Sequence, residues 1–335
     1  MRGYIMSNTA RSFGLAGLLL VSCSAAALAQ SVTVPGEQVG LSFAPAPEGV
    51  YALSTFNWHR LDGPDQSQVG VNIPILLWST PWKVLGARIE PVLATPTFFQ
   101  NTNNPAGVPN RDISWNVGTF VGSIFAWDLG NHVGVSYIVG AYLNDLDANR
   151  GSTFTGSFGN GRPNGAYTLN QLASTVIRNE VVANYTGDGW TLAAALTHNF
   201  PVDAVGQFGG AVGRAIGPVT IADGLNLDLT ATKTFDKFEI GAIGYGTTDL
   251  PVSTRDIMLG GNQYVRSGRF ALGGLVGYDF GAFKLQFYVA RDVATRAVDT
   301  RGREAYQTDG WFRISTTLYT APKARADLEP LISKP

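Results

Sequence analysis

Three histidines and a serine are the side chains here whose types could support metal binding or catalysis. His59, His132 and His198 lie far apart, and none belongs to an H-x-x-x-H pair that would place two imidazoles on one metal ion. Ser136 is four residues from His132, about 13 Å along a β-strand, which is too far for a hydrogen bond. The sequence therefore predicts no metal, no cofactor and no catalytic residue, and a barrel-wall hydrolase remains a minor alternative.

Charged side chains form a second set, because they fall on the polar face of alternating segments. Acids and bases occur in similar numbers in this set, so the side chains could pair across a narrow interior. They could equally line a polar pore that selects solutes, and both interpretations stay open. We expect these residues to line the lumen of a β-barrel: Arg88, Glu90, Arg178, Glu180, Asp228, Glu239, Lys284 and Arg313.

The elements that must position these charges alternate apolar and polar residues with period 2. After Asp223, for example, Leu225 and Leu227 are apolar while Asn226 and Asp228 are polar. This period is typical of β-strands with two different environments on their two faces. About twelve strands are expected, over residues 48–59, 68–78, 82–94, 112–127, 132–143, 172–185, 190–200, 222–234, 238–248, 269–279, 283–292 and 309–319.

The connections between these segments alternate between short and long. Short turns such as 128–131 and 235–237 alternate with long loops such as 144–171 and 201–221. Outer-membrane β-barrels show this asymmetry, with short periplasmic turns and long extracellular loops. We therefore predict an all-β chain that forms a single transmembrane antiparallel β-barrel. Closure satisfies every backbone hydrogen bond in a membrane, where an open sheet edge would be costly.

Composition fits a membrane barrel and excludes other classes. The 335 residues are only 15% charged, carry a net charge of −1 and include 40 glycines and 1 cysteine. A chain without a basic block has no electrostatic basis for binding nucleic acid. Residues 1–29 resemble an export signal, with arginines before an apolar run and a small-x-small cleavage site ending at Ala29. A lipobox-like reading, which would place a lipid on Cys23, is the alternative.

The remainder divides into a terminal segment, a barrel and a tail. Residues 30–46 are interpreted as an extended or plug-like N-terminal segment, 47–319 as the barrel and 320–335 as a periplasmic tail. Four tryptophans near the expected short turns suit a membrane interface, where an amphipathic ring sits at headgroup depth. These interface candidates are Trp78, Trp82, Trp127 and Trp190. Core packing in a soluble periplasmic β-protein is the alternative for them.

Two long loops could act at the mouth of the barrel. Residues 144–171, rich in Gly and Asn, are long enough to fold inward and constrict it. Residues 201–221 are nearly uncharged, so this loop could receive a hydrophobic solute or pack on its own rim.

Several segments resemble an outer-membrane family named for meta-pathway phenol degradation. Residues 222–228, ADGLNLD, and 238–245, FEIGAIGY, are similar to its pairing of a G-x-x-x-D strand with a glycine-rich G-x-x-G-Y strand. Residues 274–280, GLVGYDF, and 285–292, LQFYVARD, are similar to its penultimate hairpin. The resemblance implies an exported barrel associated with aromatic-compound breakdown, without transferring any binding residue. A terminal aromatic is common in bacterial barrels, and Pro335 departs from that pattern.

These observations predict an outer-membrane channel or transporter for passive uptake of small solutes, hydrophobic or aromatic ones among them. Its expected partners are outer-membrane lipid, the solute and the barrel assembly machinery, while the oligomeric state is left open. A structural or adhesive barrel with a blocked lumen is the main alternative.

Overall fold

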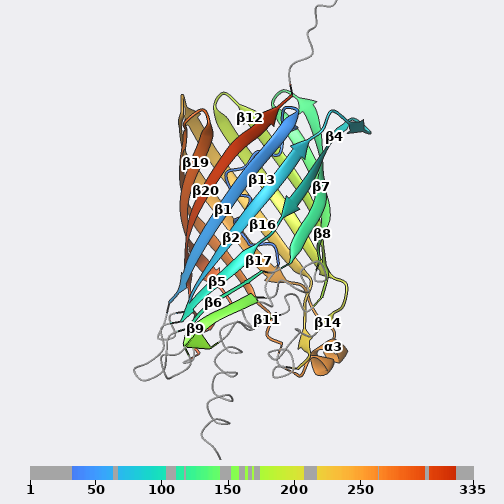
Figure 1. The fold of residues 1–335 in the computed structure, drawn as a ribbon, viewed down its shortest axis with the longest axis vertical. Coiled ribbons are helices and arrows are strands. Elements are labelled where there is room, and N and C mark those ends of the chain that lie inside the picture. The colour runs from blue at the N-terminus through green and yellow to red at the C-terminus, as the bar shows by residue number, and fades with distance from the viewer. Residues whose placement is uncertain are drawn as a thin grey trace, which may run out of the picture.

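The chain forms a closed antiparallel β-barrel (Figure 1). The computed structural model describes residues 32–62, 67–102, 111–116, 118–143, 152–157, 163–164, 168–169, 174–206, 217–262, 264–298 and 302–321. The predicted fold class, a 12-stranded all-β barrel, is confirmed.

Ten wall strands are continuous, and each of the other two is built from a pair of consecutive strands. The continuous strands are β1 (Gly49–Leu61), β2 (Ser67–Ser79), β8 (Val133–Leu143), β12 (Val176–Gly187), β13 (Trp190–Pro201), β16 (Gly224–Phe235), β17 (Phe238–Asp249), β18 (Gly268–Asp279), β19 (Phe283–Thr295) and β20 (Gln307–Thr320). The interrupted ones are β4 (Ala87–Ala94) with β5 (Thr97–Thr102), and β6 (Arg111–Asn116) with β7 (Thr119–Gly130).

The barrel closes where the first strand meets the last. β1 pairs with β20 over its whole length, from Gly49 opposite Thr320 to Leu61 opposite Gln307. β1 also pairs with β2, and β20 with β19, so the first and the last wall strand are each paired on both sides. Closure matters physically because a free strand edge presents unpaired backbone N–H and C=O groups.

The region after β2 differs from the predicted strand 82–94 and the predicted loop that follows it. Residues 82–94 contain a hairpin, because β3 (Lys83–Val84) turns through Leu85 and Gly86 into β4. The expected loop at 95–111 is largely strand, since β5 pairs with both β2 and β6. Alternation does not reveal this hairpin, because Trp82 and Val84 before the turn and Leu85 within it are all apolar.

Short turns gather at one end of the barrel and longer connections at the other (Figure 1). Several short turns use backbone in the left-handed region, at Asn131 and His132 (φ 51° and 66°) and at Asp188 and Gly189 (φ 53° and 77°). Two-residue turns of this kind match the twist of the hairpin strands. The opposite end carries β9 (Ser152–Ser157), β10 (Pro163–Asn164), β11 (Thr168–Leu169), β14 (Val205–Gly206), β15 (Val219–Thr220) and the helix α3 (Thr254–Leu259).

The helix α3 begins after Ser253, whose hydroxyl accepts a hydrogen bond from the Asp256 N–H. Among the residues that the structure describes, no helix is long and apolar enough to cross a membrane.

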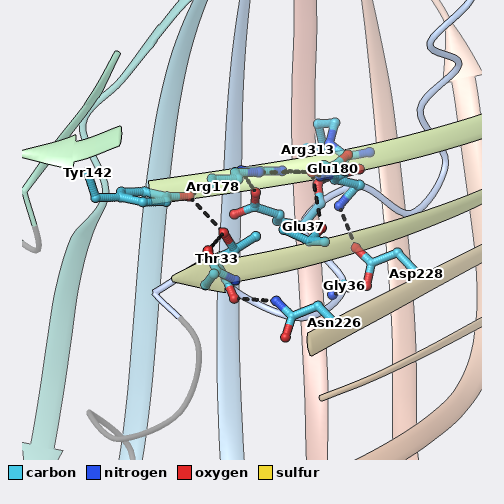
Figure 2. Close-up of polar contacts among 12 residues, drawn as sticks. Thr33, Gly36, Glu37, Tyr142, Arg178, Glu180, Asn226, Asp228 and Arg313 are labelled. Atoms are coloured by element: carbon cyan, nitrogen blue, oxygen red, sulfur yellow. Dashed lines mark hydrogen bonds and ion pairs between the residues drawn. The ribbon is translucent and has the colours of Figure 1, made fainter. Parts of the chain in front are cut away.

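Residues 32–48 lie inside the barrel and lead into β1 at its short-turn end. Figure 2 shows Thr33, Gly36 and Glu37 enclosed by side chains that the wall strands project inward. Two clusters of buried apolar side chains flank this segment, one including Val71 and Phe120 and the other including Leu275. The lumen is therefore packed with side chains at the level of this segment.

Candidate functional site

The N-terminal segment, residues 32–48, is the feature that the lumen is built around. Residues 35–40 form consecutive tight turns, with the Glu37 N–H bonded to the Val34 carbonyl at 3.0 Å and the Leu41 N–H to the Gln38 carbonyl at 3.1 Å. Positive φ angles at Gly36 and Gly40 (95° and 76°) allow the chain to coil this tightly. A coil of this shape directs several backbone groups outward, where only the wall can bind them.

Asp228 on β16 binds the coil through its backbone. One carboxylate oxygen accepts the Gly36 N–H at 2.9 Å, and the other accepts the Gln38 N–H at 3.1 Å. Two residues along the strand, the Thr230 hydroxyl accepts the Gly40 N–H at 2.8 Å. Paired N–H groups of a tight turn form a concave site for an anion, and here a wall carboxylate fills it.

Arg178 and Glu180 on β12 bind the side chains of the coil. The Arg178 guanidinium lies 2.6 Å from the Glu180 carboxylate and 2.7 Å from the Glu37 carboxylate. The same Glu180 oxygen, Oε2, accepts the Gln38 amide at 2.6 Å and the Thr197 hydroxyl at 3.0 Å. Glu37, Arg178 and Glu180 are all buried. Removing one partner would leave buried charge uncompensated.

Arg313 on β20 holds the opposite side of the coil and is fully buried. Its guanidinium donates to the Glu37 carbonyl and, at 2.6 Å, to the Val39 carbonyl. It also donates to the Tyr288 hydroxyl at 3.0 Å, which in turn donates to the Gly36 carbonyl at 2.9 Å. Asp228 and Arg313 together therefore satisfy both donors and acceptors of the same short coil.

Polar contacts continue toward both ends of the segment. Toward the long-loop end, the Thr33 hydroxyl donates to the Asn199 side chain at 2.8 Å, and the Asn226 amide donates to the Thr33 carbonyl at 2.7 Å. Toward the short-turn end, the Ala46 N–H donates to Glu90 at 2.9 Å. The wall thus holds the segment from Thr33 to Ala46.

Apolar side chains of β2 also face this segment, which corrects the alternation rule. In a membrane barrel the apolar face of a strand is expected to meet lipid, yet Val71 and Ile73 are only 1% and 2% exposed and pack in the lumen with Phe120. The outward positions of β2 include Leu76 and Trp78, which are exposed. Apolar side chains therefore lie on both faces of β2, and those on the inner face are covered by the N-terminal segment through Val32, Val34 and Phe43.

All eight side chains predicted to line the lumen lie on inward-facing positions, and they do three different things. Arg178, Glu180, Asp228, Arg313 and Glu90 bind the N-terminal segment, as described above. Lys284 and Glu239 pair with each other at 2.8 Å, nearer the short-turn end. Arg88 lies 3.6 Å from Glu48, where the segment leaves the lumen. Most of these charges therefore hold the segment. Lys284 and Glu239 pair with each other, and Glu239 also accepts the Thr232 hydroxyl at 2.7 Å and the Gln286 amide at 2.9 Å.

A further charged cluster lies nearer the long-loop end and was not predicted. Arg269 contacts Asp292 at 3.2 Å and Asp309 at 2.9 Å, and all three side chains are at most 8% exposed. The Tyr245 hydroxyl donates to Asp309 at 2.7 Å and accepts the Trp311 indole N–H at 3.1 Å. Parity along β18, β19 and β20 was the available signal, but these residues lie close to strand ends, where boundaries are least certain.

The four tryptophans predicted at a membrane interface lie near the short-turn rim. Trp78 and Trp82 are 43% and 56% exposed and meet edge to face at 5.2 Å between ring centroids. The Trp127 indole donates to the Leu85 carbonyl at 3.0 Å. Trp190 is 41% exposed and has the Lys233 ammonium 5.1 Å from its ring centroid.

His132, Ser136 and His198 lie at separate places in the described part of the wall, each with its own surroundings. His132 lies in the turn before β8, and the Ser136 hydroxyl donates to the Phe43 carbonyl. His198 contacts Asp223 at 3.0 Å. Within the described ranges, no group of three His, Cys, Asp or Glu side chains could hold a metal ion.

Some sequence predictions fall outside the described residues. These are the export signal and Cys23 within residues 1–31, most of the loop 144–171, residues 207–216 of the loop 201–221, and the tail from 322 onward.

Comparison with known proteins shows the fold alone. No protein-family model matches the sequence, and no curated protein matches it. An outer membrane channel from Pseudomonas putida F1 has a TM-score of 0.57 and 10% sequence identity, covering 82% of this chain and 97% of the channel. The translocator domain of the autotransporter NalP from Neisseria meningitidis has a TM-score of 0.47 and 10% identity, covering 92% and 96%. The transport unit of the autotransporter AIDA-I from Escherichia coli has a TM-score of 0.47 and 12% identity, covering 88% and 96%.

Proposed function

We propose that the chain is an outer-membrane channel for passive uptake of small hydrophobic solutes, aromatic ones among them, and that the N-terminal segment closes it. The observation that carries this proposal is the way the lumen is filled. Its closure depends on a separate length of chain, held largely by hydrogen bonds to the wall. Such a segment can leave without breaking any strand pairing of the barrel.

Placement in the outer membrane is supported by the outward-facing side chains. Val181, Leu196, Leu272 and Phe287 lie in the middle parts of their strands and are 50–56% exposed. Large apolar side chains in such numbers are expected where a barrel meets lipid. The fold shared with the Pseudomonas putida channel agrees with this placement. Export through a cleaved signal at residues 1–29 and insertion by the barrel assembly machinery belong to the same proposal.

The choice of solute is supported by the rings that surround the coil. Tyr288 stacks on Trp311 with a centroid distance of 5.2 Å, and Tyr245 meets Trp311 at 6.1 Å. These rings pack against the N-terminal coil, because a Cβ on Gly36 would lie 3.0 Å from both Trp311 and Tyr245. Withdrawal of the coil would uncover an apolar aromatic surface in the lumen. The resemblance to the phenol-degradation family points to the same class of solute.

A structural barrel with a permanently blocked lumen is the second candidate. The burial of residues 35–40 on all sides favours it, since leaving would expose many polar and apolar contacts. The two candidates differ in one property, which is whether the segment ever leaves.

Conductance and solute flux separate the two. The full-length barrel and a variant lacking residues 32–46 would be inserted into planar bilayers and into liposomes. A gated channel gives rare openings and measurable phenol or toluene influx for the full-length protein, and frequent openings for the variant. A full-length barrel that is sealed in both assays would overturn the channel proposal.

Two further experiments test the location and the alternative of an enzyme. Heat-modifiable migration of protein from the outer-membrane fraction tests the location. Loss of a hydrolytic activity in His132→Ala or His198→Ala would favour an enzyme.

A further inference from the structure

A groove of about 750 Å³ lies on the outer surface of the wall, where β19, β20 and β1 run side by side. It is separate from the lumen, because most of its lining residues alternate with buried ones on the same strands. Gly310 forms its floor, with Trp58 directly opposite on one neighbouring strand and Val289 on the other. The site therefore opens toward whatever surrounds the barrel.

The groove exists because two glycines flank one tryptophan. Trp58 is paired with Gly70 on one side and with Gly310 on the other. Its ring lies over Gly70, where an added Cβ would come within 2.8 Å of the indole. A Cβ on Gly310 would meet only the Trp58 carbonyl, at 3.8 Å. The indole thus covers one glycine and leaves the other as an open trough.

The two ends of the groove differ in chemistry. At the end nearer the middle of the strands, Phe56, Phe312 and Phe287 lie in register across the three strands. The ring centroids of Phe312 and Phe287 are 5.0 Å apart. At the long-loop end, four residues along each strand and about 13 Å away, the corresponding row is polar. It consists of Arg60, Thr308 and Arg291 in register.

The polar end carries an excess of positive charge. Arg291 contacts Asp62 at 2.6 Å and donates to the Thr308 hydroxyl at 2.7 Å. Among the described residues in this row and beside it, Asp62 supplies one negative charge against the two guanidinium groups of Arg60 and Arg291. Guanidinium groups bind phosphate strongly because their N–H groups match its oxygens.

We propose that this groove is a lipid-binding site that takes an acyl chain of an anionic membrane lipid. The chain lies over Gly310 between Trp58 and Val289, and the phosphate of the headgroup faces Arg60. The proposal rests on the outer-membrane placement proposed above, but not on channel activity. The apolar trough supplies binding through burial of methylene groups, and the arginine row selects the charge of the headgroup.

Filling the trough tests the site. Gly310→Leu places a side chain where the acyl chain would lie, and the space around Gly310 accommodates it without backbone strain. Gly274→Leu is the matched control, since Gly274 also faces the outside of the wall and a Cβ there would meet only a carbonyl at 3.7 Å. Native mass spectrometry would count phosphatidylglycerol and phosphatidylcholine retained by each purified full-length protein after titration with that lipid.

We expect the wild type and Gly274→Leu to retain phosphatidylglycerol in preference to phosphatidylcholine. Gly310→Leu should weaken phosphatidylglycerol binding about tenfold, the effect of losing burial of about two methylene groups. Arg60→Gln should still bind lipid but lose the preference. Equal binding by Gly310→Leu and Gly274→Leu, or no headgroup preference in the wild type, would overturn the site. Bilayer conductance should be the same for all four proteins, so failure here is distinct from failure of the channel proposal.

Discussion

Arg178 and Glu180 lie two residues apart on the inner face of β12, with 2.6 Å between guanidinium and carboxylate. Their pairing leaves the guanidinium free to reach Glu37 at 2.7 Å and the carboxylate free to accept the Gln38 amide at 2.6 Å. One wall strand therefore presents a preformed positive and negative pair that binds two consecutive side chains of the N-terminal segment. The pair fixes both the position and the register of that segment.

Arg178→Met is expected to destabilise the barrel and to loosen its closure. Removing the guanidinium leaves the Glu37 and Glu180 carboxylates buried without their cation, which costs about 3–5 kcal/mol for a buried pair. The urea midpoint of the protein in phospholipid vesicles measures the change, and bilayer recordings should show more frequent openings.

Arg291→Met is the matched control for that substitution. Arg291 also pairs with a carboxylate at 2.6 Å, but both side chains are about half exposed. An exposed ion pair contributes less than about 1 kcal/mol. If both variants lost the same stability, or if Arg178→Met left the opening frequency unchanged, Arg178 would not be an anchor of the segment.

Gly36→Ala should displace the coil from the rings that enclose it. An added Cβ would lie 3.0 Å from Trp311 and from Tyr245, and the φ of 95° also disfavours any side chain. We expect faster cleavage of residues 32–46 by an added protease and a higher open probability in bilayers.

Gly217→Ala separates backbone strain from crowding. Gly217 has a φ of 80°, and an added Cβ there meets nothing within 4 Å. The strain, about 1–2 kcal/mol, is common to both variants. Protease resistance should fall only in Gly36→Ala, and an equal effect in Gly217→Ala would show that the rings do not hold the coil.

The barrel could be predicted from the sequence because its physics is local to each strand. Period-2 alternation, two-residue turns and the short and long connections all follow from a sheet with different environments on its two faces. β16 illustrates this, since Leu225 and Leu227 face outward while Asn226 and Asp228 face inward. The same alternation is the basis of the prediction that the eight charged side chains line the lumen.

The sequence suggested a plug-like N-terminal segment, but the contacts that hold this segment in the lumen could not be predicted, because they join distant parts of the chain. Asp228 accepts the N–H of Gly36, 192 residues away, and nothing near either residue encodes the pairing. The direction of the apolar side chains of β2 could not be predicted for a related reason. Val71 and Ile73 face inward, where the N-terminal segment covers them, although the apolar face of a barrel strand is expected to meet lipid.

The membrane placement of the wall can be tested by a charge scan at two depths. Leu196 lies near the middle of β13 and is 52% exposed, whereas Phe235 ends β16 at the short-turn rim and is 56% exposed. Leu196→Arg should cost about 2–4 kcal/mol, and Phe235→Arg about 0–1 kcal/mol, because an arginine is costly at mid-depth and cheap at the interface. The free energy of unfolding in phospholipid vesicles measures both. Leu196 and Phe235 have similar exposed fractions, so a difference between the two losses of stability cannot come from different degrees of exposure. Equal and small losses at the two positions would contradict a lipid-facing wall.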